Sequence, residues 1–217
     1  MREIVAPDVA DKTLPITERL LAITFDEAFA VRRWWQRLTL NPEELKAFTK
    51  QPPWPRGARA ALRRCDSPES AMLTEAFRLL WQQLPQQESS EGQRDVRLQV
   101  WSCIALVLAE VREEKSGITL GSQLGKQKKE TGKPCMSELR FQQLVSCHSP
   151  EELMQRLRRA LALIDKQGVS VVHLADNIAL WWGEYQGRLA ASPSKRLGFQ
   201  WANDYFGALT AYQRDTD

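Results

Sequence analysis

One glycine- and lysine-rich stretch, ITLGSQLGKQKKETGKP, has the composition of a loop that binds phosphate. A nucleotide-hydrolysing P-loop needs two glycines with four residues between them, then a Lys and a Ser or Thr whose hydroxyl holds magnesium. Gly121 and Gly125 enclose only three residues, and Gln127 follows Lys126 where the hydroxyl belongs. The alternative spacing, from Gly125 to Gly132, encloses six residues. The spacing excludes P-loop chemistry.

The same stretch keeps a strong positive charge, which we place in a loop at 115–134. Its second half carries four lysines against one acid, Glu130. The lysines are Lys126, Lys128, Lys129 and Lys133. A solubilising surface loop is one interpretation. Contact with a nucleic-acid backbone is the other, because scattered lysines contact phosphates without sequence preference.

Arginines are concentrated on one side of a helix expected at 56–65. At about 100° per residue, Arg56, Arg59, Arg63 and Arg64 share one half of the helix, and apolar side chains occupy the other half. No acid precedes Asp66 to neutralise them. The face is either solvated surface or a row of guanidinium groups for phosphate, which arginine binds in bidentate fashion.

A second arginine cluster lies in a helix expected at 149–168. Arg156 follows Glu152 by four residues, so a salt bridge accounts for it. Arg158 and Arg159 have Met154 and Gln155 at that spacing and therefore no such partner. Three separate basic clusters together favour a phosphate-binding protein.

Catalytic and metal chemistry find little support in the sequence. The four cysteines and two histidines show no C-x-x-C or H-x₃₋₅-H spacing, so no structural zinc site is predicted. Cys147 and His148 are adjacent, and a Cys–His nucleophile pair stays open as an alternative. Trp181 and Trp182 could stack on bases, but we interpret them as core residues.

The charge distribution points to an anionic partner. The formal net charge is +3, yet residues 1–31 carry three basic residues against six acids. An acidic N-terminal extension thus precedes a basic body. The longest apolar run, WSCIALVLA, is too short to span a bilayer, and the start has no signal-peptide core. We expect a cytoplasmic protein with reduced cysteines and no cofactor.

The apolar periodicity is helical almost throughout, and we identify no convincing pair of alternating strands. Caps and breaks place helices at 17–38, 56–65, 67–84, 94–114 and 149–168, with others from Asn41, Ser137 and Ser170 and near the end of the chain. The predicted fold class is all-α, with two small packed bundles. The expected divisions are an acidic extension at 1–30, a bundle at 31–114, the basic loop at 115–134 and a bundle at 135–217.

Four sequence motifs follow one another over roughly residues 31–188. They are WQRL at 35–38, GARAALRRC at 57–65, ITLGSQL with SELRFQQLV at 118–124 and 137–145, and LMQRLRRALALI with IALWWG at 153–164 and 178–183. In this order and spacing they resemble the CasB family, the small subunit of the type I-E CRISPR surveillance complex Cascade.

The resemblance implies an all-helical, non-catalytic subunit of Cascade in antiviral defence. Two copies would contact the backbone and large subunits and hold the pairing of CRISPR RNA with target DNA, together with the displaced strand of the R-loop. The residues in matching motifs are Arg59, Arg63, Arg64, Arg140, Arg158 and Arg159, and we add the loop residues Lys126, Lys128 and Lys129. The alternative is a helical adaptor whose arginine faces bind acidic partner subunits.

Overall fold

The computed structural model describes residues 19–55, 57–86, 90–128 and 131–214, without side chains after 211. The acidic extension falls mostly outside these residues, as do Arg56 and Lys129. The helices in order are α1 (Phe25–Thr39), α2 (Pro42–Leu45), α3 (Ala58–Arg64), α4 (Pro68–Met72), α5 (Glu75–Trp81), α6 (Glu91–Leu108), α7 (Leu120–Gly125), α8 (Glu138–Val145), α9 (Pro150–Leu163), α10 (Val171–Tyr185), a 3₁₀ turn (Pro193–Lys195) and α11 (Leu197–Arg214). The all-α prediction is confirmed.

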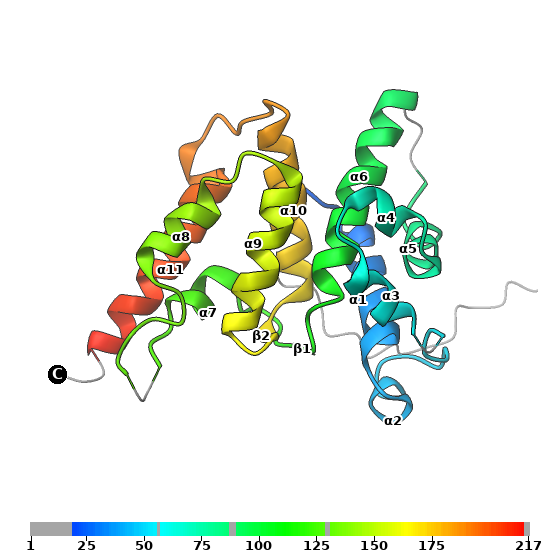
Figure 1. Ribbon diagram of the computed structural model, residues 1–217, viewed down its shortest axis with the longest axis horizontal. Helices are drawn as coiled ribbons and strands as arrows, with labels where there is room; N and C mark the ends of the chain where they lie inside the picture. The colour runs from blue at the N-terminus through cyan, green and yellow to red at the C-terminus, as the bar shows by residue number, and fades with distance from the viewer. Residues whose placement is uncertain (1–18, 56, 87–89, 129–130, 215–217) are drawn as a thin grey trace, which may run out of the picture.

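The helices form two groups that pack along a shared boundary. Helices α1 to α6 lie on one side, and α7 to α11 lie on the other (Figure 1). Contacts of α10 with α1 and α6, and of α9 with α6, join the groups. The buried apolar side chains make one connected cluster through both groups. The exact boundaries at 31–114 and 135–217 stay a prediction.

Helix α6 is the centre of the core, as its broad apolar stripe predicts. Every residue from Trp101 to Ala109 is buried. The helix begins at Glu91 behind the capping residue Ser90 and ends at Leu108, earlier than expected. Within the described residues, no helix has the length and apolarity needed to cross a membrane.

A buried carboxylate fixes the segment that leads into α1. Asp176 on α10 accepts hydrogen bonds from the backbone N–H groups of Leu21, Ala22 and Ile23, at 2.8–3.1 Å. Thr24 then caps α1 through a capping box with Glu27. These contacts explain why α1 begins at Phe25, although its apolar pattern extends back to residue 17.

Two expected helices end earlier than their patterns suggest. The helix predicted at 67–84 is divided into α4 and α5, because the Thr74 side chain accepts a hydrogen bond from Phe77 N and starts a new helix. Helix α9 ends at Leu163, since Asp165 and Lys166 adopt positive φ. Gly168 also has positive φ, at 77°, but lies beyond the helix end.

A small parallel sheet forms at the ends of two predicted helices, 94–114 and 149–168. Strand β1 (Glu113–Glu114) pairs with β2 (Gln167–Val169) in an irregular register. The backbone also donates from Arg112 N to Lys166 O at 2.7 Å. This pairing holds the chain after α9 against the chain after α6.

Candidate nucleic-acid interface

Glu110 gathers basic side chains from distant parts of the sequence at the end of α6. Its buried carboxylate lies 3.2 Å from Arg63 Nε on α3 and 2.5 Å from Lys166 Nζ after α9. Arg158 Nε on α9 is 3.8 Å away. Burial opposes ionisation, but the hydrogen bond and charge of Lys166, with the charges of Arg63 and Arg158, outweigh it. The pKa of Glu110 therefore lies below its ordinary value.

Arg59 caps the carboxyl end of α6 rather than projecting into solvent. Its Nε donates to Ala109 O and its Nη2 to Val111 O, both at 2.8 Å. A guanidinium suits this position, because helix carbonyls at that end have no partner within the helix. Burial lowers the pKa of Arg59, and repulsion from Arg63 adds to that effect.

The expectation that these arginines have no partners is wrong for three of them. Arg63 and Arg158 contact Glu110, and Arg59 contacts backbone carbonyls. Arg158 Nη1 also donates to Cys65 O at 2.8 Å, just beyond α3. The sequence could not reveal this, since Glu110 is 47 residues or more from each of its partners. The site still holds more cations than carboxylates.

Arg64 differs from its neighbours on α3. Its side chain is exposed and donates from Nε only to Ala60 O of its own helix, at 3.2 Å. Among the described residues it has no ion pair. Its guanidinium keeps most of its donors for an external partner.

A groove between α8 and α9 collects the remaining predicted arginines. Arg140, Arg156 and Arg159 line it, together with Met136 and apolar side chains of both helices, and its volume is about 420 Å³. Arg156 is paired with Glu152 at 2.6 Å, as its spacing predicted. Arg140 and Arg159 are exposed, and no described residue forms a hydrogen bond or ion pair with either of them.

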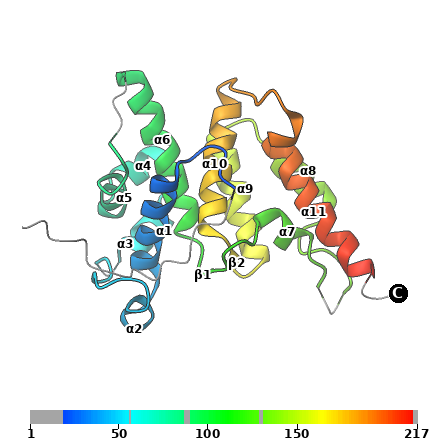
Figure 2. The same cartoon turned by 180° about the vertical axis from the view of Figure 1, so that it is seen from behind.

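These elements face the same side of the molecule. Helices α3, α9 and α8 are nearest the viewer in Figure 1, and α1, α10 and α11 come forward when the molecule is turned (Figure 2). We call the row Arg63, Arg64, Arg158, Arg159 and Arg140 the arginine face. Arg158 and Arg159 are consecutive, so they connect its Glu110 part with its α8–α9 groove.

The lysine loop is shorter than expected, and the described segments on its two sides are paired. Residues 120–125, which we placed in it, form helix α7. After them Lys128 N donates to Lys133 O and Cys135 N to Lys126 O, both at 2.8 Å, so 126–128 and 133–135 pair as the two sides of a hairpin. Lys126 and Lys128 are exposed on it.

The two glycines that suggested phosphate binding serve helix packing instead. They are four residues apart, so they share the face of α7 that lies against α11. A Cβ at Gly121 would come within 2.9 Å of Trp201 O, and a Cβ at Gly125 would overlap Tyr205 O. Only glycine lets the two backbones approach this closely.

The Cys147–His148 alternative gains no support. Burial raises the pKa of the Cys147 thiol to about 12, which opposes formation of the nucleophilic thiolate. The described residues contain no cluster of three His, Cys, Asp or Glu side chains that could hold a metal. Trp181 and Trp182 are buried, as expected for core residues.

Lys166 is a basic residue of this site that sequence reasoning missed. It lay inside the helix predicted at 149–168, where nothing distinguished it from a solvated lysine. The structure instead places it after α9, at φ 63°, with its ammonium group on Glu110. Gly168 predicts the stop of that helix, and the sequence carries no signal that the non-glycine residues Asp165 and Lys166 adopt the left-handed backbone first.

The chain is similar to one known protein family. A family model described as CRISPR-associated protein Cse2 matches residues 58–206, more than half of the chain. No curated protein and no solved structure matches the chain. Cse2 is the CasB family, the non-catalytic small subunit of Cascade in type I-E CRISPR defence, so the chain's non-enzymatic role follows from the match. The chain belongs to the Cse2 family.

Proposed function

We propose that the arginine face binds the phosphate backbone of nucleic acid within Cascade, where it stabilises the pairing of CRISPR RNA with target DNA and the displaced DNA strand. The observation that carries this is the exposure of Arg64, Arg140 and Arg159 without an acidic partner among the described residues. Opening a DNA duplex to form an RNA–DNA hybrid is nearly balanced in free energy, so added backbone contacts shift it.

The arginines that pair with Glu110 also favour phosphate binding by the arginine face. Glu110 fixes Arg63 and Arg158 at the base of the face, and one carboxylate does not neutralise its three cations. A fixed positive field attracts a polyanion without reading its sequence. The hairpin lysines Lys126 and Lys128 extend the same attraction, and Lys129 belongs to this proposal by sequence alone.

Single-stranded DNA binding at several salt concentrations tests the proposal. Fluorescence anisotropy would compare the wild type with a triple variant, Arg64→Gln, Arg140→Gln and Arg159→Gln. Each lost phosphate contact reduces the slope of log K against log salt by roughly 0.7 for a single strand, so the slope should fall by about 2. The matched control is Arg78→Gln, Arg94→Gln and Arg188→Gln, which removes three exposed arginines outside the face.

The adaptor function remains the second candidate, and exposed apolar side chains favour contact with protein. Leu139 on α8 is 67% exposed, and Phe199 and Phe206 on α11 are 54% and 42% exposed. If arginines of the face bound acidic subunits instead, the triple variant would lose assembly with Cascade while its DNA binding stayed unchanged. Equal slopes for the triple variant and its control would overturn the nucleic-acid proposal.

A further inference from the structure

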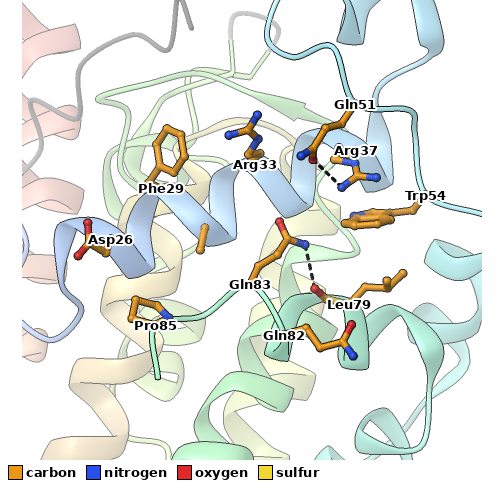
Figure 3. A pocket seen from close by; sticks show the side chains of 11 residues that line it. Asp26, Phe29, Arg33, Arg37, Gln51, Trp54, Leu79, Gln82, Gln83 and Pro85 are labelled. Atoms are coloured by element: carbon orange, nitrogen blue, oxygen red, sulfur yellow. Dashed lines mark hydrogen bonds between the residues drawn. The ribbon is translucent and has the colours of Figure 1, made fainter. Parts of the chain in front are cut away.

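The groove between α1 and α5 contains two arginines that already have partners within the protein. The Arg37 guanidinium lies 3.3 Å from the centre of the Trp54 ring and donates from Nη1 to Gln51 Oε1 at 2.8 Å (Figure 3). Arg33 donates from Nη2 to Thr49 Oγ1 at 3.0 Å. The basic residues of this groove therefore serve the fold.

A second groove, between α10, α11 and the segment before α1, has basic residues of a different kind. Its volume is about 300 Å³, at the lower end of the range of small-molecule sites, about 300–1,000 Å³. Arg19 and Lys195 line it, and both are exposed. Among the described residues, neither side chain has a hydrogen bond or an ion pair. Their charges are available to an anion.

This groove is held in shape and lies away from the arginine face. The hydrogen bonds from Leu21 N to the carboxylate of Asp176 keep the segment that carries Arg19 beside α10. Helices α10 and α11 come forward in Figure 2, whereas the arginine face is turned toward the viewer in Figure 1. The groove is therefore a separate site, formed before any ligand arrives.

A buried amide presents unused donors to this groove. Asn177 on α10 is 6% exposed and lines the groove. Its Oδ1 accepts a hydrogen bond from Trp201 Nε1 at 2.8 Å. An indole N–H only donates, so the amide oxygen must face Trp201, and the Nδ2 group with its two N–H donors points away from it. No described residue accepts a hydrogen bond from this Nδ2. Buried donors normally have an acceptor, which a ligand would supply here.

A carboxylate stands on the other side of Trp201. Asp204 follows Trp201 by three residues on α11 and also lines the groove. A Cβ on Gly121 would come within 3.0 Å of Asp204 Cβ, which places Asp204 beside α7. Asp204 forms no ion pair with any described residue, although two cations line the same groove. The groove therefore offers an acceptor for N–H groups apart from its positive charges.

The rest of the lining suits a flat ring. Phe199 on α11 is 54% exposed at the groove. Gln200 Nε2 donates to Lys195 O at 3.0 Å, which leaves its Oε1 as an acceptor. An exposed aromatic ring beside amide and carboxylate groups is the combination with which proteins hold a single unstacked base.

We propose that this groove binds a guanine nucleotide, taken either as one nucleotide of a single strand or as a free mononucleotide. Arg19 and Lys195 hold the phosphate, and the base stacks on Phe199. Asp204 accepts from the N–H groups on the edge of guanine, and Asn177 donates to the guanine carbonyl oxygen. Among the bases, guanine alone presents N–H groups on two adjacent atoms, which match the two oxygens of a carboxylate.

The proposal goes beyond the proposed function. The arginine face contacts the backbone without reading sequence, whereas this groove selects a base. Its residues lie outside the arginine face, so each proposal can fail without the other.

Photo-crosslinking with 8-bromoguanine gives a direct test on the full-length protein. One probe is a short single-stranded DNA with one 8-bromodeoxyguanosine, and the other is 8-bromodeoxyguanosine monophosphate. Mass spectrometry of tryptic peptides should find the adduct on residues 197–214, which contain Phe199, or on 167–188, which contain Asn177. Labelling by the monophosphate indicates a mononucleotide site, and labelling by the DNA alone indicates a strand site.

The choice of base is tested with matched 8-bromoadenine probes. Guanine probes should give at least about fivefold more adduct, because a good bidentate contact discriminates by at least that factor. Asp204→Asn should remove this preference, since an amide offers one acceptor where the carboxylate offers two. Asp95→Asn, an exposed residue of α6 outside the groove, should leave the preference unchanged.

Further substitutions separate this groove from its surroundings. Phe199→Ala should reduce the adduct yield at least about fivefold through the loss of stacking, and Lys195→Gln should reduce it as well. The controls are Phe25→Ala and Lys50→Gln, which change exposed residues outside the groove.

Three results would overturn the proposal. They are adduct on neither peptide, equal yields from the guanine and adenine probes, and equal yields from Phe199→Ala and Phe25→Ala. The triple variant of the arginine face should leave labelling by the monophosphate unchanged, which keeps the two proposals distinguishable.

Discussion

Two consecutive residues of α9 belong to regions with opposite properties. Arg158 faces α3 and α6, where it meets Glu110 and the Cys65 carbonyl. Arg159 lines the groove toward α8 and has no partner among the described residues. In the first region the positive charges pair with groups of the protein itself and stabilise the fold. In the second region the positive charge is available to an external ligand. Charge counted along a sequence therefore overstates the charge that can bind a ligand.

The largest expected effect comes from removing the carboxylate of the first region. Glu110→Gln leaves Arg63, Arg158 and Lys166 crowded without their counter-charge. Hydrogen bonds to charged groups contribute about 1.5–3 kcal/mol, so urea unfolding should show a free energy of unfolding lower by about that amount. Glu43→Gln is the control, because its pair with Lys46 is exposed and should change stability by less than about 1 kcal/mol. Similar losses in both variants would contradict the role of Glu110.

The contact between α7 and α11 depends on close packing, whereas the region around Glu110 depends on charge. Gly125→Ala forces a methyl group against Tyr205 O, and overpacking of this kind costs about 1–3 kcal/mol. Gly207→Ala on α11 has open space and should be neutral or stabilising by up to about 1 kcal/mol. Thermal unfolding of the two alanine variants compares them. A loss of stability in Gly207→Ala but not in Gly125→Ala would contradict the close backbone contact at Gly125.

Arg158→Ala tests the border between the regions. It removes the donor to Cys65 O and a charge near Glu110, and a buried hydrogen-bond partner left unmade costs about 1–3 kcal/mol. Arg156→Ala, on the same helix and in a more exposed pair, should cost less than about 1 kcal/mol. Chemical denaturation ranks the two variants, and an equal or larger loss for Arg156→Ala would show that the Glu110 contacts contribute little.

At acidic pH the stabilisation that Glu110 contributes to the fold should be lost. Its folded pKa lies below the ordinary 4.5, so its stabilisation is fully present above that pH and is lost as pH falls through the folded value. The difference in unfolding free energy between wild type and Glu110→Gln should be constant from about pH 6 to 8 and shrink below about pH 4.5. A difference that grew in acid would mean that the pKa is raised instead.

The smallest effect on stability is expected in the second region. Arg140→Ala and Arg159→Ala remove exposed side chains and should change the unfolding free energy by less than about 0.5 kcal/mol each. Each should nevertheless reduce the salt slope of DNA binding by roughly 0.7. Denaturation checks the expected stability, and fluorescence anisotropy checks the expected salt slope. A large loss of stability would place these arginines with the first region.

Local signals in the sequence were sufficient for most of the fold. Asn41, Ser149 and Ser170 each cap the helix that they predicted. Errors arose where a distant group decides the outcome. Asp176 delays the start of α1, and the pairing of β1 with β2 accompanies the early end of α9. Propensity along a window contains no information on such contacts.

The candidate site shows the same limit. Residue type and helical spacing singled out the arginines, and the resemblance placed them in a family. Neither could tell Arg158 from Arg159, because that difference depends on Glu110, 48 residues away in the chain. Gly121 and Gly125 suggested phosphate binding from composition, whereas their surroundings show contact with the backbone of α11.

The Asp176 anchor has a consequence for how the chain folds during synthesis. Its three backbone partners precede it by 153 to 155 residues, so the contact closes most of the chain into one loop. At about 5–20 residues per second, a ribosome needs roughly 8–30 s between making the two ends. Residues 21–23 therefore lack their Asp176 partner for that time. Contacts of this range slow folding in general, so residues 21–23 should be among the last described parts of the nascent protein to resist proteolysis.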